Sequence, residues 1–181
     1  MIKYLILLLF SSCIVITSRG PDDGYASADK DQLSGFQDAM AQSDTFKIVE
    51  IKADEFKSVL PKSGNAVVIL WASWCGRCLV ELPSLIEASK TRPIYFVSSD
   101  YGLKRMNKEF KDYQKPIYVV SSRAYGADEI EKNRGFLHEL STQLDSVPIA
   151  FPKHLYFKQG EFAGVIEGRL NSQVLDSLLS K

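Results

Sequence analysis

Short apolar runs of strand length alternate with helix-like patterns from residue 46 to the end of the chain. Residues 66–71 are apolar throughout and rich in β-branched side chains, which is typical of a strand buried on both faces. Residues 46–51 alternate between apolar and polar positions, as a half-buried strand does. Further strands are predicted over residues 93–98, 117–120, 154–158 and 161–166, the last two joined as a hairpin across Lys158, Gln159 and Gly160.

Apolar residues at helical spacing fill the segments between these strands. They predict a short helix over residues 55–60, a longer one from about Cys75 to Ser89, and a charged one over about 103–113. Asn171 is a plausible N-cap for a last helix. Residues 121–147 add a further helical pattern, and its predicted apolar face carries Ile130, Phe136, Leu137, Leu140 and Leu144.

The N-terminal residues carry a targeting pattern. Lys3 precedes an apolar stretch that ends at Ile16, which is interrupted only by a Ser-Ser-Cys run and is too short for a comfortable transmembrane helix. We therefore expect residues 1–20 to direct export to the periplasm or cell envelope. Cys13 lies in a segment that resembles a loose bacterial lipoprotein signal, which implies lipidation and a membrane tether. Cleavage near residues 18–20 and an uncleaved anchor are the alternatives.

Residues 21–44 show no convincing periodicity and are rich in small and polar side chains, so we expect a flexible tether there. The folded domain is then expected over residues 45–181. An apolar content of 45% is enough for one domain of this length to bury a core. The 22 basic and 22 acidic residues cancel, so no charge pattern favours nucleic acid as a partner.

The candidate chemistry lies where the apolar strand 66–71 meets the long helix. Cys75 and Cys78 are separated by two residues there, so their sulfur atoms can reach each other and can cycle between dithiol and disulfide. Cys75 lies where unpaired N–H groups and the positive end of the helix dipole stabilise a thiolate. We therefore predict that Cys75 is the attacking thiol and that Cys78 is the more buried resolving thiol.

Residues 69–78, Ile-Leu-Trp-Ala-Ser-Trp-Cys-Gly-Arg-Cys, resemble the active-site segment of the thioredoxin superfamily. Pro83 matches the proline that kinks the active-site helix of that family. Residues 151–160 are similar to the family segment that starts at a cis-proline and ends in a hairpin turn. The resemblance covers about residues 46 to 181. It implies an α/β thioredoxin fold, a central mixed sheet flanked by helices, with an inserted strand and helix segment before the cis-proline.

The insertion, the export pattern and Glu81, three residues after Cys78, resemble the TlpA-type branch of this superfamily. Pro152 is the expected cis-proline because its spacing to Gly160 fits the family better than that of Pro148. The substrate-binding surface is expected to include Trp74, Gly76, Arg77, Phe151 and Pro152.

Proton handling is assigned to Glu81. The superfamily buries an Asp in the strand before the motif, and Ile69 stands at that position here. Glu81 shares a helix face with Cys78, so its carboxylate can accept or relay the Cys78 proton. A solvated surface role is the alternative for Glu81. For Arg77 the alternatives are electrostatic support of the thiolates and simple exposure, and for Trp74 they are shaping the substrate surface and simple packing.

The resemblance implies an extracytoplasmic thiol-disulfide oxidoreductase without metal or organic cofactor, acting on protein disulfides or dithiols and fed by a membrane electron donor. Reduction of substrates is the favoured direction, and thiol oxidation or a non-catalytic peptide-docking module are the alternatives. A structural disulfide or half of a zinc site would be a different use of Cys75 and Cys78. Zinc needs two more ligands, and His138 and His154, at unsuggestive spacings, are expected to be structural or surface residues.

Overall fold

A seven-stranded sheet runs through the computed structural model, which describes residues 33–36 and 46–180. Its order is β1-β2-β5-β4-β3-β6-β7; the first five of these strands pair in parallel, and β6 and β7 pair antiparallel. The predicted central mixed sheet is therefore confirmed, and β5 is the inserted strand. The strands are β1 (Leu33–Ser34), β2 (Ile48–Ile51), β3 (Asn65–Trp71), β4 (Ile94–Ser98), β5 (Ile117–Val120), β6 (Lys153–Lys158) and β7 (Glu161–Ile166).

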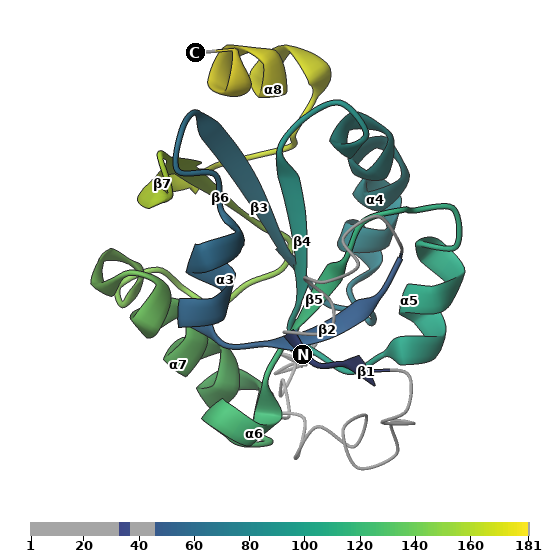
Figure 1. Ribbon diagram of the computed structural model, residues 1–181, viewed down its shortest axis with the longest axis vertical. Coiled ribbons are helices and arrows are strands. Elements are labelled where there is room, and N and C mark those ends of the chain that lie inside the picture. The colour runs from purple at the N-terminus through teal and green to yellow at the C-terminus, as the bar shows by residue number, and fades with distance from the viewer. Residues whose placement is uncertain (1–32, 37–45, 181) are drawn as a thin grey trace, which may run out of the picture.

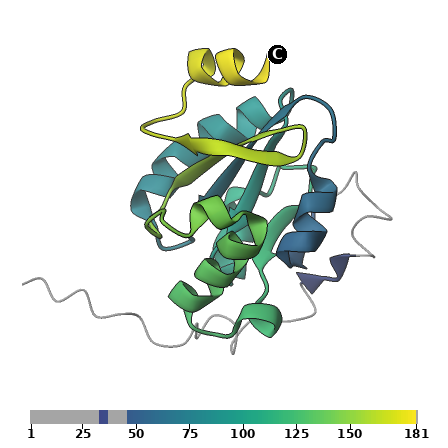
Figure 2. The same cartoon turned by 90° about the vertical axis from the view of Figure 1, so that its left-hand side faces the viewer.

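Helices cover both faces of this sheet. In Figure 1, α4 and α5 lie on one side of the sheet, and α3, α6 and α7 lie on the other. Figure 2 shows α6 and α7 in front of the sheet. The helices are α3 (Ala53–Val59), α4 (Gly76–Ser89), α5 (Leu103–Glu109), α6 (Ser122–Tyr125), α7 (Glu129–Leu140) and α8 (Ser172–Leu179), with a short 3-10 helix η2 (Thr142–Leu144) after α7.

Strand β3 divides the core into two halves because its side chains alternate between the faces. Ile69 and Trp71 pack with the buried face of α4 and with Phe110, whereas Val68 and Leu70 pack with α3 and α7. All seven residues of β3 are buried. Each large apolar side chain buried in this way stabilises the fold by about 1.5–3 kcal/mol. The strand that precedes the cysteine motif is therefore packed on both of its faces.

The boundaries of α3, α4 and α5 differ from the sequence prediction, and α3 covers residues 53–59 instead of 55–60. Helix α4 begins at Gly76, and Cys75 is its N-cap rather than its first residue. Helix α5 ends at Glu109 and does not reach residue 113. The chain turns there because Phe110 and Tyr113 pack against Phe96, with ring centroids 5.2 and 5.7 Å apart. Aromatic packing in the core therefore overrides the charged helical pattern.

The inserted segment is helical as predicted, but Ile130 does not belong to its buried face. Its side chain is 44% exposed, whereas Phe136, Leu137 and Leu140 are buried against the sheet. Ile130 lies in the first turn of α7, next to Glu129, which accepts a hydrogen bond from Ser99, the residue after β4. The placement of Ile130 on the apolar face was therefore wrong, because at the start of α7 it is Glu129, not Ile130, that contacts the end of the sheet.

Part of the expected tether is described by the structure. Leu33–Ser34 forms β1 and pairs in parallel with β2, and Phe36 packs against the core half that contains Val68 and Leu70. The apolar segment with Lys3 and Cys13 lies outside the described residues, so the signal, tether and domain limits stay predictions. In residues 33–36 and 46–180, no helix combines the length and the apolar content that a membrane crossing needs.

Candidate active site

The cysteine motif occupies the turn between β3 and α4. The Cys75 N–H donates to the carbonyl of Ala72 at 3.1 Å, which folds the chain back as it leaves the strand. Cys75 caps α4, and its Sγ accepts a hydrogen bond from the Cys78 N–H at 3.1 Å. A sulfur at this position faces the unsatisfied N–H groups and the positive end of a fourteen-residue helix, which favours a thiolate.

Cys75 and Cys78 form a disulfide in the structure. Both residues are buried, with exposures of 6% for Cys75 and 3% for Cys78. Cys78 is thus the more buried cysteine, as predicted, although the difference is small. The helix N-terminus, rather than exposure, therefore distinguishes the two sulfur atoms.

Buried Asp100 holds the turn that precedes Cys75. Its carboxylate accepts hydrogen bonds from the N–H and the hydroxyl of Ser73, the first at 2.8 Å. Gly102 leaves room for this contact, because a Cβ at that residue would lie 2.1 Å from Ser73 Oγ. Asp100 was not identified from the sequence, where it appears only as one acidic residue after a strand.

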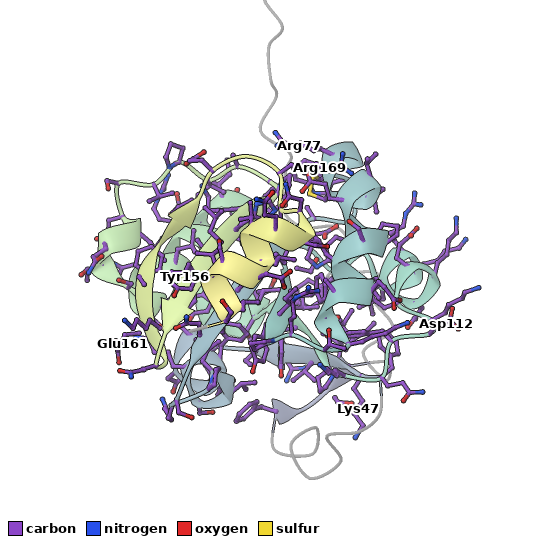
Figure 3. All side chains as sticks on the ribbon, turned by 90° about the horizontal axis from the view of Figure 1, so that it is seen from above. Lys47, Arg77, Asp112, Tyr156, Glu161 and Arg169 are labelled. Carbon is purple, nitrogen blue, oxygen red and sulfur yellow. A yellow bond between two sulfur atoms is a disulfide. The ribbon has the colours of Figure 1, made fainter. Side chains whose placement is uncertain are left out.

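Glu81 is buried, with 5% of its surface exposed, so the solvated surface role is excluded. Its Oε1 accepts a hydrogen bond from Arg77 Nε at 3.3 Å across one turn of α4. The Arg77 side chain is 64% exposed and lies at the outer edge of the molecule beside α4 (Figure 3). The Arg77 guanidinium therefore forms an ion pair with the Glu81 carboxylate. Any electrostatic support that it gives the sulfur atoms is in addition to this ion pair.

The second carboxylate oxygen of Glu81 faces His154. Glu81 Oε2 lies 3.5 Å from His154 Nε2, and the two side chains are 6% and 2% exposed. Burial lowers the pKa of His154, and the neighbouring Glu81 charge opposes this effect. His154 is buried rather than at the surface, and its contact with Glu81 was missed. The signal available was an ionisable residue within the apolar strand that follows Pro152.

Trp74 lies beside the motif with 45% of its surface exposed. Its ring packs edge-on against Phe151 with centroids 5.7 Å apart, and its indole N–H donates to Glu129 Oε1 at 3.1 Å. The same Glu129 oxygen accepts the Ser99 hydroxyl at 2.7 Å. The structure therefore brings together Trp74 and Phe151, both expected at the substrate surface, and adds Glu129 from the inserted segment.

The Phe151–Pro152 peptide bond is cis, and within the described ranges it is the one cis bond recorded, so the choice of Pro152 over Pro148 is confirmed. Pro152 leads directly into β6, which pairs with β3 beneath the motif. Gly76 is exposed, and the space where a Cβ would lie is open. Across residues 33–36 and 46–180, no three His, Cys, Asp or Glu side chains gather as a metal site requires.

Solved structures of other proteins are similar to this chain, and two of them come from Chlorobium tepidum TLS and Thermus thermophilus. A thiol:disulfide interchange protein of the thioredoxin family from Chlorobium tepidum TLS is similar at a TM-score of 0.52 with 16% identity, over 68% of this chain and 82% of that one. A thio-disulfide isomerase from Thermus thermophilus is similar at a TM-score of 0.46 with 19% identity, over 67% of this chain and 79% of that one.

No protein-family model matches the sequence, and neither does any protein of curated function. The likeness to the Chlorobium structure shows that this chain has the thioredoxin fold, as the motif order predicted. The fold and the Cys75–Cys78 disulfide define a thioredoxin-fold protein with a redox-capable cysteine pair.

Proposed function

We propose that this protein is an exported thiol-disulfide oxidoreductase that reduces disulfides in protein substrates. The observation that carries the proposal is the Cys75–Cys78 disulfide at the N-terminus of α4 in a thioredoxin fold. A cysteine at a helix N-cap is favoured as a thiolate, and a second cysteine one turn later is placed to complete an exchange. Both sulfur atoms of the proposed exchange therefore lie in the first turn of α4 or at its N-cap.

The reaction takes two steps. The Cys75 thiolate attacks one sulfur of the substrate disulfide, forming a mixed disulfide and releasing the first substrate thiolate. Cys78 then loses its proton and attacks Cys75 Sγ, which releases the second substrate thiolate and forms the Cys75–Cys78 bond. The substrate gains two electrons and the enzyme dithiol loses two. A reductant of the thiol class must then restore the dithiol.

The surface around the disulfide suits an extended protein substrate. Trp74 and Phe151 form an aromatic edge, the space beside Gly76 is open, and Arg77 is exposed next to it. Phe151 precedes Pro152, and its backbone groups would pair with an incoming chain in a short β-like contact. We assign substrate binding to these five residues and proton acceptance to Glu81.

The finer assignment is a TlpA-type protein. Glu81 after the motif, the inserted β5 and α7 segment, and the targeting pattern of residues 1–20 support it. Export would place the domain where disulfides form and persist, and a tether at Cys13 would keep it near a membrane electron donor. No metal or organic cofactor enters the proposed exchange.

Reduction of insulin disulfides with dithiothreitol as the electron source tests the activity. We expect the chain of residues 21–181 to accelerate insulin precipitation, and Cys75→Ser and Cys78→Ser to abolish the acceleration. Lack of acceleration by wild-type protein, with binding of insulin chains retained, would favour the peptide-docking alternative. Oxidation of a reduced, unfolded protein by the disulfide form tests the oxidase alternative, which gains support only if that reaction is faster than insulin reduction.

A further inference from the structure

We propose that His154 completes a buried proton-accepting pair with Glu81, and that this pair takes up the proton that Cys78 loses when it resolves the mixed disulfide. The inference rests on the proposed function and adds a buried partner to Glu81, the proton acceptor proposed there. His154 acts through Glu81, so it is a positioning residue for the proton.

The sheet register brings His154 to the required place. In the antiparallel ladder of β3 and β6, His154 is directly opposite Ile69. Residues directly opposite in such a ladder project from the same face of the sheet. Ile69 belongs to the core half that also contains Cys75, Cys78 and Leu82, so the imidazole enters the core from the sheet on the α4 side. An imidazole on β6 therefore stands next to the position where β3 carries no ionisable group.

Glu81 and His154 face each other through one carboxylate oxygen and one ring nitrogen. Glu81 Oε2 and His154 Nε2 are buried and have no hydrogen-bond partner, and they lie 3.5 Å apart. His154 also makes a hydrogen bond to the backbone of Gly168. When Nδ1 donates that bond, Nε2 of the neutral ring carries a lone pair. Two buried acceptors without a donor are unfavourable. One added proton converts this contact into a charge-assisted hydrogen bond, so the pair has a place for one proton.

The charged groups around the pair come from α4 and from the segment after β7. Arg77 on α4 holds the other oxygen of Glu81 and disfavours a cation on His154. Glu167 favours that cation, as Glu81 does. Burial is the larger influence and lowers the pKa of His154, so the ring is neutral before the proton arrives. A neutral ring beside a carboxylate is a ready acceptor.

In the resolving step, Cys78 loses its proton and forms the disulfide bond with Cys75. Cys78 is 3% exposed and lies three residues before Glu81 on the same helix face. Its S–H bond breaks, the proton passes to the Glu81 and His154 pair, and the sulfur electron pair forms the bond to Cys75 Sγ. The bond between Cys75 and the substrate sulfur breaks, and the substrate leaves as a thiolate. The proton returns to Cys78 when the disulfide is reduced again.

Rapid mixing of the reduced protein with dithiobis(nitrobenzoate) tests the pair. Attack by Cys75 releases one coloured thiolate, and resolution by Cys78 releases a second, so the two steps are seen separately. This leaving thiolate stays ionised, so the proton that moves in the second phase is that of Cys78. We expect His154→Gln to slow the second phase by about tenfold or more, because Glu81 must then accept the Cys78 proton without its partner. In wild type, the rate of the second phase should rise with pH between about pH 5 and pH 8, where histidine titrates. In His154→Gln, this rise should be smaller.

Matched variants make the test specific. His138 is the other histidine, is mostly exposed and pairs with Asp145, so His138→Gln should behave like wild type. His154→Asn keeps a donor for Gly168 and serves if the Gln variant unfolds. The double variant Glu81→Gln with His154→Gln should be no slower than the slower single variant, because the residues act as one unit. An unchanged second phase and pH profile in both folded His154 variants would overturn the inference, whereas absence of the first phase in wild type would overturn the proposed function.

Discussion

The indole N–H of Trp74 donates to Glu129 Oε1 at 3.1 Å, and this bond ties the active-site turn to the first turn of the inserted helix α7. Trp74 also packs against Phe151, the residue before the cis-proline. The aromatic edge beside the disulfide is therefore positioned by a segment that a minimal thioredoxin fold does not need. The insertion therefore contacts the surface to which we assign substrate binding.

Replacing Glu129 with Ala should loosen this aromatic edge. Glu129 also accepts a hydrogen bond from Ser99, but the bond from Trp74 is the one that reaches the aromatic edge. A hydrogen bond of this kind is worth about 0.5–1.5 kcal/mol, so we expect KM for a protein disulfide to rise by roughly threefold to tenfold. The rate with dithiobis(nitrobenzoate) should stay within about twofold, because a small disulfide needs little of the surface. Glu131→Ala is the control, since Glu131 lies in the same helical turn and pairs with exposed Arg134. Equal effects of the two variants would exclude a specific role for Glu129.

Alkylation should distinguish the two cysteines of the reduced protein. Cys75 caps α4 and is favoured as a thiolate by the helix N-terminus, so iodoacetamide at mildly acidic pH should label Cys75 well before Cys78. Peptide mass spectrometry after a short reaction gives the ratio. Preferential labelling of Cys78 would reverse the roles assigned to the two sulfur atoms.

Cys78→Ser should trap substrates. The variant keeps the attacking thiolate but lacks the thiol that resolves the mixed disulfide, so covalent adducts should accumulate. A non-reducing gel should show adducts of higher mass that vanish with reductant and are absent from Cys75→Ser. Cell extracts that contain no Cys75-dependent adducts, under conditions where wild type reduces insulin, would count against the two-step exchange.

Fractionation tests the predicted export and tether. The pattern of residues 1–20 predicts that the full chain is recovered with membranes and faces an oxidising compartment. Cys13→Ala should release it if the tether is a lipid on that cysteine. Recovery of the wild-type chain with the soluble cytoplasmic proteins would overturn export. An unchanged fraction for Cys13→Ala would overturn lipidation alone.

Acid should destabilise the domain partly through His154. Burial lowers the pKa of His154 in the folded state below its unfolded value of about 6.5, so the unfolded chain binds the proton more tightly. The stability that comes from the neutral ring is present above about pH 6.5 and is lost as pH falls through the folded pKa. The unfolding free energy of wild type should therefore fall more steeply than that of His154→Gln between about pH 7 and pH 5. Denaturant titrations at several pH values measure this, with His138→Gln following wild type. Parallel curves for wild type and His154→Gln would contradict the prediction.

Local chemistry explains what could be predicted from the sequence. The N-cap role of Asn171, whose side chain accepts a hydrogen bond from the Val174 N–H, follows from neighbours in the chain. The hairpin turn at Gln159 and Gly160 follows from a glycine that adopts positive φ easily. Cys75 at the start of α4 follows from an apolar strand that meets a helical pattern. Each of these depends on residues a few positions apart, so the order of residues is sufficient.

By itself, the sequence determined the order of the strands from β2 onward, the cysteine pair, and the choice of Pro152 and Glu81 as candidates. Only the tertiary structure decided which side chains meet across elements. Glu81 and His154 come from α4 and β6, and Trp74 and Glu129 are 55 residues apart. Such contacts depend on strand register and helix packing, since a shift of one residue in the β3 and β6 ladder would turn His154 to the other face of the sheet.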